Sequence, residues 1–380
     1  MSNDFDLPQS QPLSGISVID LTSNVAAPFG SAVLADLGAQ VVHVEGPKGD
    51  DCRRMYPTDG TGSAYFSVVN RNKSAITLDI RDSQDRSSLE NLIAQADVFV
   101  TNLRPGKLER LGLDDSTLCS RFPRLIHASL SAYGKSGIEQ NKPGYDAVLQ
   151  ARTGIAAVTG EADGPPVRAG VSILDVGAGT WLALGVLAAL LRRERTGQGG
   201  SVATSLFETG VSWVSYHIAA HQLTGQPSRR HGSGHPAFSP YGIYETADGL
   251  LCIGVGSDLM FLELCAALDR LDLRDDPRFS RNVDRSVNAQ VLRAELEKTL
   301  KCRTAEDWAR DLSQKGLPVD AVNNPEDLLN DQLSAETGIL LNTDTPSGTT
   351  IRIPGLPLTF DGQRPAIRTA APSHAPHRGQ

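Results

Sequence analysis

The sequence lacks several features that define common classes of protein. Its five cysteines are far apart and no two form a CxxC pair, which argues against a zinc ribbon or a disulfide framework and favours a reducing compartment. It contains no GxxxxGK[ST], HExxH or GxSxG motif, which argues against the common classes of NTPase, metallopeptidase and serine hydrolase. The first residues show neither the basic stretch nor the apolar stretch of a signal peptide. We therefore expect a cytoplasmic protein with no metal site.

Charge and hydropathy exclude two further classes. The chain has 36 basic and 44 acidic residues, a net charge of −8, which argues against nucleic acid or an anionic membrane as a partner. The apolar uncharged stretch 176–191 is shorter than the roughly 18 to 20 residues that span a bilayer. We expect this stretch to form a buried core helix, and the protein to have no membrane partner.

What the sequence does contain is an alternation of strand and helix patterns. Residues 15–45 read as a β-α-β unit, with the β-branched run ISVIDL, the helical run PFGSAVLADLGA and a second strand, VVHVE. Further strands are expected at 74–80, 97–102 and within 124–134. Such alternation is typical of an α/β fold in which helices cover both faces of a parallel sheet.

The alternation changes near residue 224 and suggests a division into domains. The segment TGQPSRRHGSGHPAFSP is rich in Gly and Pro and is typical of a linker or a functional loop. We expect a large domain over 1–224, a small domain over 225–325, and a return of 326–380 to the large domain with a C-terminal tail.

The first β-α-β unit has one feature of a dinucleotide site, because Glu45 ends its second strand. However, the turn after the first strand reads TSNVAAPFG rather than GxGxxG, so the backbone cannot approach a pyrophosphate in the usual way. This argues against NAD or FAD.

A single carboxylate, Asp175, lies between a short apolar run and the long apolar helix. We expect its side chain to lie at the N-terminus of that helix, stabilised there by unpaired backbone N–H groups and the helix dipole. The small residues Gly177, Ala178 and Gly179 follow and would let a bulky ligand come close. From these residues alone, Asp175 is either an ordinary helix cap or a nucleophile.

Two groups of cations lie beside expected strands in this acidic chain. Arg104, Lys107 and Arg110 lie in TNLRPGKLERLGL, where an open α/β sheet binds ligands and where Arg suits phosphate; a solvated helix start is the alternative. A second group lies around the strand expected at 74–80. Its members are Arg71, Lys73 and Arg81. The histidines are scattered, and we expect His127 and His217 to be surface or satisfied core residues.

Motifs along nearly the whole chain together resemble one known family. They are PLSGISVIDLT, PFGSAVLADLGAQVVHVEGPKGD, NRNKSAITLDI, ADVFVTNLRPGKLERLGL, SAYGKSG, PGYDAVLQARTGIAAVTG, GVSILDVGAG, TGQGGSVATSLFE, SPYGIYETADG, DDPRFSRNVDR and KGLPVDAVN. They resemble the class III coenzyme A transferases, which include formyl-CoA, carnitine-CoA and succinyl-CoA transferases and the related α-methylacyl-CoA racemases. The resemblance implies a Rossmann-like large domain with a smaller α+β domain, in an interlocked homodimer.

The resemblance also implies a site. In this family the Asp that matches Asp175 is a covalent nucleophile, which forms an aspartyl anhydride and then an aspartyl-CoA thioester. Coenzyme A thioester is thus a substrate, and no permanently bound cofactor is implied. The glycine-rich loop of the family resembles GSGHP, so Gly232 and Gly234 are candidates for closing over the intermediate. Residues that match the CoA contacts of the family are Asn24, Leu78, Arg81, Asn102, Leu103, Arg104 and Arg110.

Three departures from the family pattern bear on the substrate and the reaction. Val25 stands where formyl-CoA transferases have Gln, and Gly46 stands where they have a phosphate-binding Arg, which argues against formate and oxalate as the preferred pair. The racemases use a His in a GHD motif, whereas this chain has Tyr145 beside Asp146. A tyrosine with a pKa of about 10 is a poor base at neutral pH. Asp146 could instead help to position substrate.

The sequence therefore predicts a transferase that moves CoA from an acyl-CoA to a carboxylic acid, with succinyl-CoA as a common donor of the family. An acyl-CoA racemase of the same fold is the first alternative. A CoA-binding protein without turnover is the second.

Overall fold

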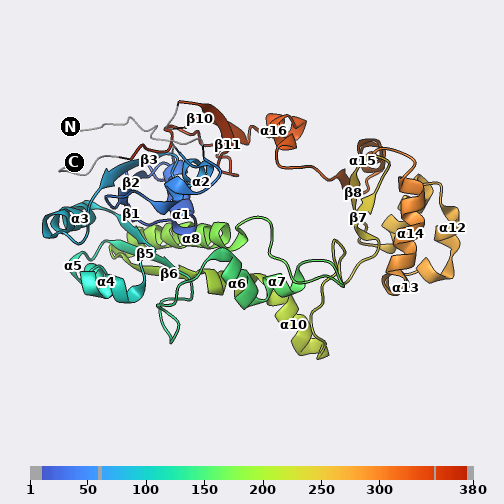
Figure 1. Ribbon diagram of the computed structural model, residues 1–380, viewed down its shortest axis with the longest axis horizontal. Coiled ribbons are helices and arrows are strands. Elements are labelled where there is room, and N and C mark those ends of the chain that lie inside the picture. The colour runs from blue at the N-terminus through green and yellow to red at the C-terminus, as the bar shows by residue number, and fades with distance from the viewer. Residues whose placement is uncertain (1–10, 59–61, 346–347, 375–380) are drawn as a thin grey trace. The chain divides into compact units, whose positions relative to one another are not determined.

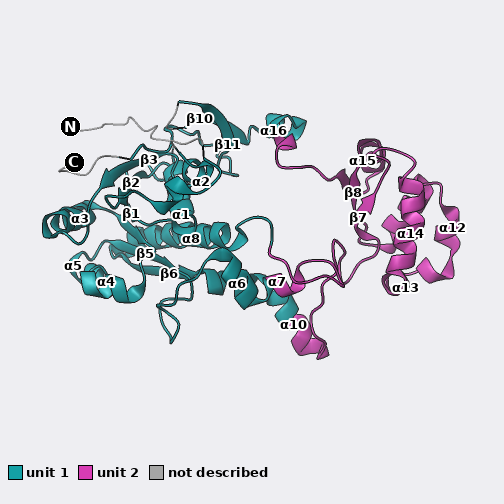
Figure 2. Cartoon of the chain, viewed as in Figure 1, with its two compact units in different colours: residues 1–155, 169–218, 329–380 teal, residues 156–168, 219–328 magenta. Residues whose placement is uncertain are grey.

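A computed structural model of the chain describes residues 11–58, 62–345 and 348–374. The chain folds into two compact units (Figure 2). The first comprises residues 1–155, 169–218 and 329–380, and the second comprises 156–168 and 219–328. The division expected from the sequence ends the first segment at residue 224, and it does not anticipate that 156–168 groups with the second unit.

The first unit contains a six-stranded sheet and the helices that cover it. Its strands are β1 (Ser17–Leu21), β2 (Gln40–Glu45), β3 (Lys73–Thr77), β4 (Val98–Thr101), β5 (Ile126–Ser131) and β6 (Gly200–Ser205), with a separate hairpin of β10 (Leu340–Asp344) and β11 (Thr350–Pro354). Its helices are α1 (Ala26–Asp36), α2 (Ala64–Val69), α3 (Ser83–Gln95), α4 (Pro105–Leu111), α5 (Asp115–Arg121), α6 (Asp146–Thr153), α8 (Ile173–Thr196), α9 (Leu206–Trp213) and α16 (Gln332–Thr337), with a 3-10 turn at Asp51–Arg54. The helices α7 (Ile155–Val158) and α10 (Ser215–Thr224) cross the boundary between the units.

All six strands of the large sheet are parallel, in the order β3-β2-β1-β4-β5-β6. This is the strand order of the Rossmann fold. The expected α/β class, with a Rossmann-like large domain, is therefore confirmed. The β-α-β unit expected over 15–45 corresponds to β1, α1 and β2.

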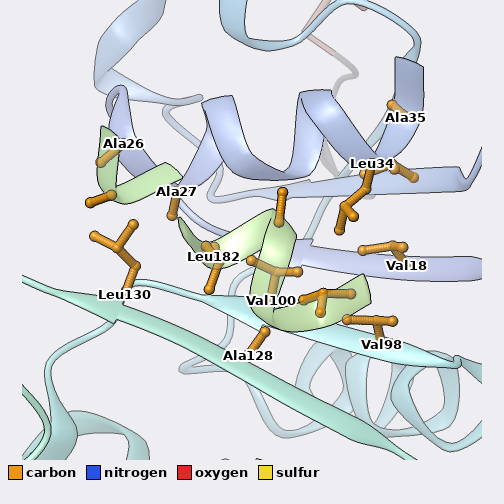
Figure 3. Close-up of a cluster of buried hydrophobic side chains, with 14 of the residues drawn as sticks. Val18, Ala26, Ala27, Leu34, Ala35, Val98, Val100, Ala128, Leu130 and Leu182 are labelled. Atoms are coloured by element: carbon orange, nitrogen blue, oxygen red, sulfur yellow. The ribbon is translucent and has the colours of Figure 1, made fainter. Parts of the chain in front are cut away.

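Alternate side chains of the central strands pack on opposite faces of the sheet. Val98 and Val100 of β4 belong to the cluster that contains α1 and α8, whereas Phe99 belongs to the cluster that contains α3, α4 and α5. Figure 1 shows α1 and α8 together on the first of these faces. Figure 3 shows Leu182 of α8 among side chains of α1 and of the strands. The unit is thus a three-layer α/β/α structure, with a core on each side of the sheet.

The stretch expected to form a core helix lies in α8. With 24 residues, α8 is long and apolar enough to cross a membrane by length and composition. However, Leu174, Leu182, Val186 and Leu190 are buried in the main core with α1 and the sheet. In this structure α8 is a core helix of the large unit, as the sequence predicts.

The second unit is smaller and has an α+β composition. Its antiparallel sheet has the order β7-β8-β9, with β7 at Tyr241–Glu245, β8 at Leu250–Gly254 and β9 at Val319–Ala321. Its helices are α11 (Asp258–Ala267), α12 (Leu271–Asp275), α13 (Asn282–Val287), α14 (Ala289–Leu300) and α15 (Ala305–Ser313), with a 3-10 turn at Pro277–Phe279. A second 3-10 turn, Asp327–Leu329, crosses the boundary back to the first unit. Apolar residues of the strands and of α11, α14 and α15 form a core of its own.

Candidate active site

The residues that match CoA contacts gather at one edge of the parallel sheet. Asn24, Leu78 and Asn102 follow the ends of β1, β3 and β4 by three residues or fewer, and parallel strands bring their carboxyl ends to the same edge. Because α8 runs back to feed the parallel strand β6, its N-terminus lies at this edge too. The fold thus brings Asp175 and these candidates to the same side of the sheet.

Asn24 and Asn102 shape the loop after β1. Asn24 adopts a left-handed backbone with φ of 68°, and its main-chain N donates to Asp50 Oδ1 at 3.2 Å. Asn102 accepts from the main-chain N of Ser23 at 3.1 Å and donates to Ser23 O at 2.7 Å. Asn102 therefore holds the loop in place through its amide, a role that the sequence does not reveal.

The candidate phosphate ligands differ in their availability. Arg104 and Arg110 are exposed, and neither has an ion pair among the described residues. Arg81 is also exposed, but its guanidinium donates to both carboxylate oxygens of Asp79, at 2.8 and 2.7 Å. Arg104 and Arg110 are thus free to meet an anionic ligand, whereas Arg81 would have to leave Asp79 or share it.

Two of the cations near β3 are structural, contrary to the grouping made from the sequence. Arg71 is buried and donates to Asp36, with Nη2 to Oδ2 at 2.6 Å. Lys73 is buried and its Nζ lies 2.9 Å from Asp20 Oδ2. A cation that neutralises a buried carboxylate is not available to a ligand at the surface.

Glu45 is likewise occupied within the protein. Its Oε2 accepts from Arg53 Nε and from the main-chain N of Asp50, both at 2.8 Å. Burial raises the pKa of Glu45, but the hydrogen bond and charge of Arg53 outweigh this effect and hold the pKa below its ordinary value. This carboxylate supports the turn after β2 and is not free for a ribose.

Asp175 lies in the first turn of α8, two residues after its first residue, Ile173. The expectation of unpaired N–H groups around it is wrong. The first four N–H groups of α8 donate within the protein: Ile173 to Val171 O at 2.8 Å, Leu174 and Asp175 to Asp146 Oδ2 at 2.7 and 3.3 Å, and Val176 to Ser172 O at 3.1 Å.

The electrostatic setting of Asp175 is the opposite of a stabilised cap. Burial, together with the negative charge of Asp146, raises its pKa from 3.8 to about 7. The side chain is partly exposed, and its carboxylate is not among the hydrogen-bond acceptors found in the described residues. A carboxylate with a high pKa and no bound donor is a better nucleophile than an ordinary one.

The sequence does not identify Asp146 as the hydrogen-bond acceptor for the main-chain N–H groups of Leu174 and Asp175. Asp146 is the first residue of α6 and is buried, and its second oxygen accepts from Gln150 Nε2 at 2.5 Å. Gln150 Oε1 in turn accepts from the main-chain N of Ala169 at 2.8 Å. The spacing of the Asp and the Gln in PGYDAVLQ, one helical turn apart, is the only signal of this pairing in the sequence.

Gly177 and Gly179 serve helix packing rather than the approach of a ligand. A Cβ atom at Gly177 would lie 2.2 Å from the Trp213 ring, and one at Gly179 would lie 2.4 Å from Ala26 O. Both glycines are buried. They let α8 pack closely on α9 and α1, which corrects the expectation drawn from the sequence.

The remaining candidates lie at two places. Tyr145 precedes α6 and is 68% exposed. Gly232 and Gly234 lie in the second unit, whereas Asp175 lies in the first. Gly232 has a φ of 58° and donates its main-chain N to Gly160 O at 3.0 Å, so this loop is tied to another segment of its own unit.

A small hollow opens beside α4, α5 and the ends of β5 and β6, and Leu103 is the predicted CoA contact that lines it. Asp175 does not line it. His127 also lines it; this residue is buried, with Nε2 3.0 Å from Leu113 O. The hollow is therefore not the site of the proposed nucleophile. Among the residues that the structure describes, no group of three or more His, Cys, Asp or Glu could hold a metal ion.

Comparisons with known proteins identify the family to which the chain belongs. The family described as CoA-transferase family III matches residues 13–378. An acetyl-CoA:oxalate CoA-transferase from Acetobacter aceti is 36% identical over 95% of this chain and 92% of its own length. A succinyl-CoA:glutarate CoA-transferase from Mus musculus is 35% identical over 92% of this chain and 81% of its own length.

Solved structures show the same likeness over nearly the whole chain. A CAIB/BAIF family protein from Brucella suis has a TM-score of 0.85 and 31% identity, covering 96% of each chain. Rv3272 from M. tuberculosis, in its orthorhombic form, has a TM-score of 0.85 and 32% identity, covering 96% of this chain and 97% of its own. The chain is thus a member of CoA-transferase family III and a CoA-transferase by its relatives, as the motifs of the sequence imply.

Proposed function

We propose that this enzyme transfers CoA from an acyl-CoA donor to a carboxylic acid through covalent intermediates on Asp175. The observation that supports this most strongly is the setting of Asp175: a partly exposed carboxylate with a raised pKa, at the sheet edge where the candidate CoA contacts gather. A carboxylate is suited to this role because its anhydride exchanges a thioester for an acid without water.

The proposed cycle has four steps that balance. The Asp175 carboxylate attacks the thioester carbonyl of the donor, which forms an anhydride and expels CoA thiolate. The thiolate attacks the aspartyl carbonyl of the anhydride, which forms aspartyl-CoA and releases the donor acid. The acceptor carboxylate then attacks aspartyl-CoA, forming a second anhydride and expelling thiolate again. Finally the thiolate attacks the acceptor carbonyl, which releases the new acyl-CoA and restores the Asp175 carboxylate.

In this proposal Arg104 and Arg110 hold phosphate groups of CoA. Both side chains are exposed; Arg104 caps the start of α4 and Arg110 lies in its last turn. Arg pairs well with phosphate through charge-assisted hydrogen bonds. The net charge of −8 gives the whole protein no general attraction for anions. Local cations of this kind are therefore needed to bind CoA.

For the acceptor we propose a dicarboxylic acid, with succinyl-CoA as donor. Relatives are named for oxalate, for glutarate and, in Haloarcula hispanica, for mesaconate, all of which are dicarboxylates. The departures at Val25 and Gly46 argue against oxalate, so glutarate and mesaconate rank first.

We also propose a homodimer in a reducing cytoplasm. The support is the set of exposed apolar side chains on α8 to α10, which includes Trp181, Leu184 and Tyr216, and the five free cysteines.

The experiment is a screen of acyl-CoA donors against a panel of acids, with new thioesters detected by mass spectrometry. We expect a new acyl-CoA from succinyl-CoA and a dicarboxylate, and its loss in Asp175→Asn. Hydroxylamine should trap an adduct on Asp175 when donor is present. The racemase alternative predicts that solvent deuterium enters the α-carbon of a branched acyl-CoA without exchange of CoA. No transfer with any pair, and no effect of Asp175→Ala on any property, would favour a binding protein.

A further inference from the structure

Asp146 is joined to the start of α8 by a short chain of hydrogen bonds. One carboxylate oxygen accepts from the main-chain N of Leu174 and of Asp175, and the other accepts from Gln150. Gln150, fully buried, accepts from the main-chain N of Ala169. These bonds tie α6 to both ends of the segment that leads into α8, so the orientation of Asp175 depends on Asp146.

Asp146 is also the charge that acts on Asp175. Burial and the negative charge of Asp146 are the two causes of the raised pKa. Other charged groups on the elements packed against α8 are engaged elsewhere: Asp36 of α1 with Arg71, Arg152 of α6 with Glu139, and Glu208 of α9 with Ser205. On β5, His127 lies against Leu113 O, and β6 has no charged residue. The charged residues of α8 beyond Asp175 lie in its last turns.

We propose that Asp146 is a positioning residue for the covalent chemistry of Asp175. Asp146 fixes the first turn of α8 through two amide hydrogen bonds, and its negative charge disfavours the free Asp175 carboxylate relative to the neutral acylated forms of Asp175. This inference rests on the proposed function.

The second effect follows from the balance of charge. When Asp175 attacks the donor thioester, the negative charge passes to the CoA thiolate and then to the departing acid, while acylated Asp175 is neutral. Repulsion between Asp146 and Asp175 is present before the reaction and absent after it. The same interaction therefore favours protonation of Asp175 and, at higher pH, favours its acylation.

The test compares two variants with the wild-type enzyme. Asp146→Asn removes the charge but keeps an oxygen that can accept amide protons. Gln150→Met removes a hydrogen bond of the same network but keeps the charge, and it serves as the matched control. Each protein is mixed with succinyl-CoA, without an acceptor, from about pH 5 to about pH 9. Intact mass then gives the fraction of protein with bound CoA, and rapid quenching gives the rate of its formation.

In the wild-type enzyme, the rate should rise with pH to a plateau with a midpoint near 7, the pKa of Asp175. In Asp146→Asn the midpoint should fall, and the equilibrium ratio of CoA adduct to free enzyme above pH 7 should fall by roughly tenfold for each pH unit of that change. Gln150→Met should keep the wild-type midpoint. If Asp146→Asn does not fold, Asp146→Ser offers a neutral oxygen acceptor at the same position.

The two proposals fail in different ways. If the wild-type enzyme forms no adduct with any donor of the panel, the proposed function is wrong. If the wild-type enzyme forms the adduct but folded Asp146→Asn shows the same midpoint and the same ratio, only the role of Asp146 is wrong. A midpoint that moves equally in Gln150→Met would assign the effect to the hydrogen-bond geometry and would overturn the role of the charge.

Discussion

Gly177 of α8 lies so close to Trp213 of α9 that a Cβ atom on the glycine would stand 2.2 Å from the indole ring. Substituting Gly177 by Ala should therefore force the two helices apart and lower stability by about 1–3 kcal/mol. Thermal unfolding measures this effect. Gly256→Ala is the control, because a Cβ atom there meets no atom within 4 Å. An unfolding temperature equal to that of the wild type in Gly177→Ala would contradict the packing described.

The raised pKa of Asp175 predicts how stability depends on pH. Its pKa is about 7 in the folded protein, compared with an ordinary value of 3.8. The folded state therefore binds the proton more tightly, and the stability gained from it is complete below about pH 4 and is lost as pH rises to about 7. In the wild type this effect changes the free energy of unfolding by at most about 1.4 kcal/mol per pH unit between about pH 4 and about pH 7, and Asp175→Asn should remove that change. Denaturant unfolding of both proteins at several pH values checks this. Parallel curves would mean that Asp175 has an ordinary pKa.

Arg110 is exposed in the last turn of α4 and has no ion pair among the described residues, so its proposed role in holding CoA phosphate can be tested directly. Arg110→Ala should raise the KM for acyl-CoA by about 10- to 100-fold, the value of a charge-assisted hydrogen bond, with a smaller change in kcat. Steady-state kinetics gives both constants. Arg195→Ala, an exposed site in the last turn of α8, should leave the KM unchanged. An equal effect of the two substitutions would indicate a general loss of charge.

Lys73 neutralises the buried carboxylate of Asp20, and we therefore expect Lys73 to contribute to the stability of the fold. Burial raises the pKa of Asp20, but the charges of Lys73 and His43 outweigh this and hold the pKa below its ordinary range. Lys73→Met should cost about 3–5 kcal/mol, because it leaves Asp20 buried without its ammonium partner. Lys73→Met with Asp20→Asn should recover part of this loss. The surface pair of Lys301 and Glu245 provides the control, and Lys301→Met should change stability by less than about 1 kcal/mol.

The parallel sheet could be predicted from the sequence because its signals are local. The β-branched runs and the helical run between 15 and 45 correspond to β1, α1 and β2, and each is specified by neighbouring residues. The position of Asp175 at the start of a long helix follows from the same kind of local pattern. The order of the strands in the sheet does not, because it depends on pairing between distant segments.

The partners of individual side chains could not be predicted, because they come from distant segments. Lys73 meets Asp20, which is 53 positions away, and the amides beside Asp175 meet Asp146, 28 and 29 positions away. A cation in a strand pattern looks the same whether it faces a ligand or a buried carboxylate. The sequence therefore identifies Lys73 as a cation beside a strand and Asp175 as a carboxylate at the start of a helix, but not the group that each one contacts.

The central claim is that Asp175 itself is acylated in each turnover, and oxygen exchange tests it most directly. In the proposed cycle one oxygen of the acceptor carboxylate remains on Asp175 when the new acyl-CoA leaves. The enzyme is therefore incubated with succinyl-CoA and an acceptor acid labelled with ¹⁸O, digested with trypsin, and analysed by mass spectrometry. The peptide 169–192 contains Asp175 as its only acidic side chain. We predict that this peptide gains ¹⁸O during turnover; transfer of CoA with no ¹⁸O in the peptide would contradict the account.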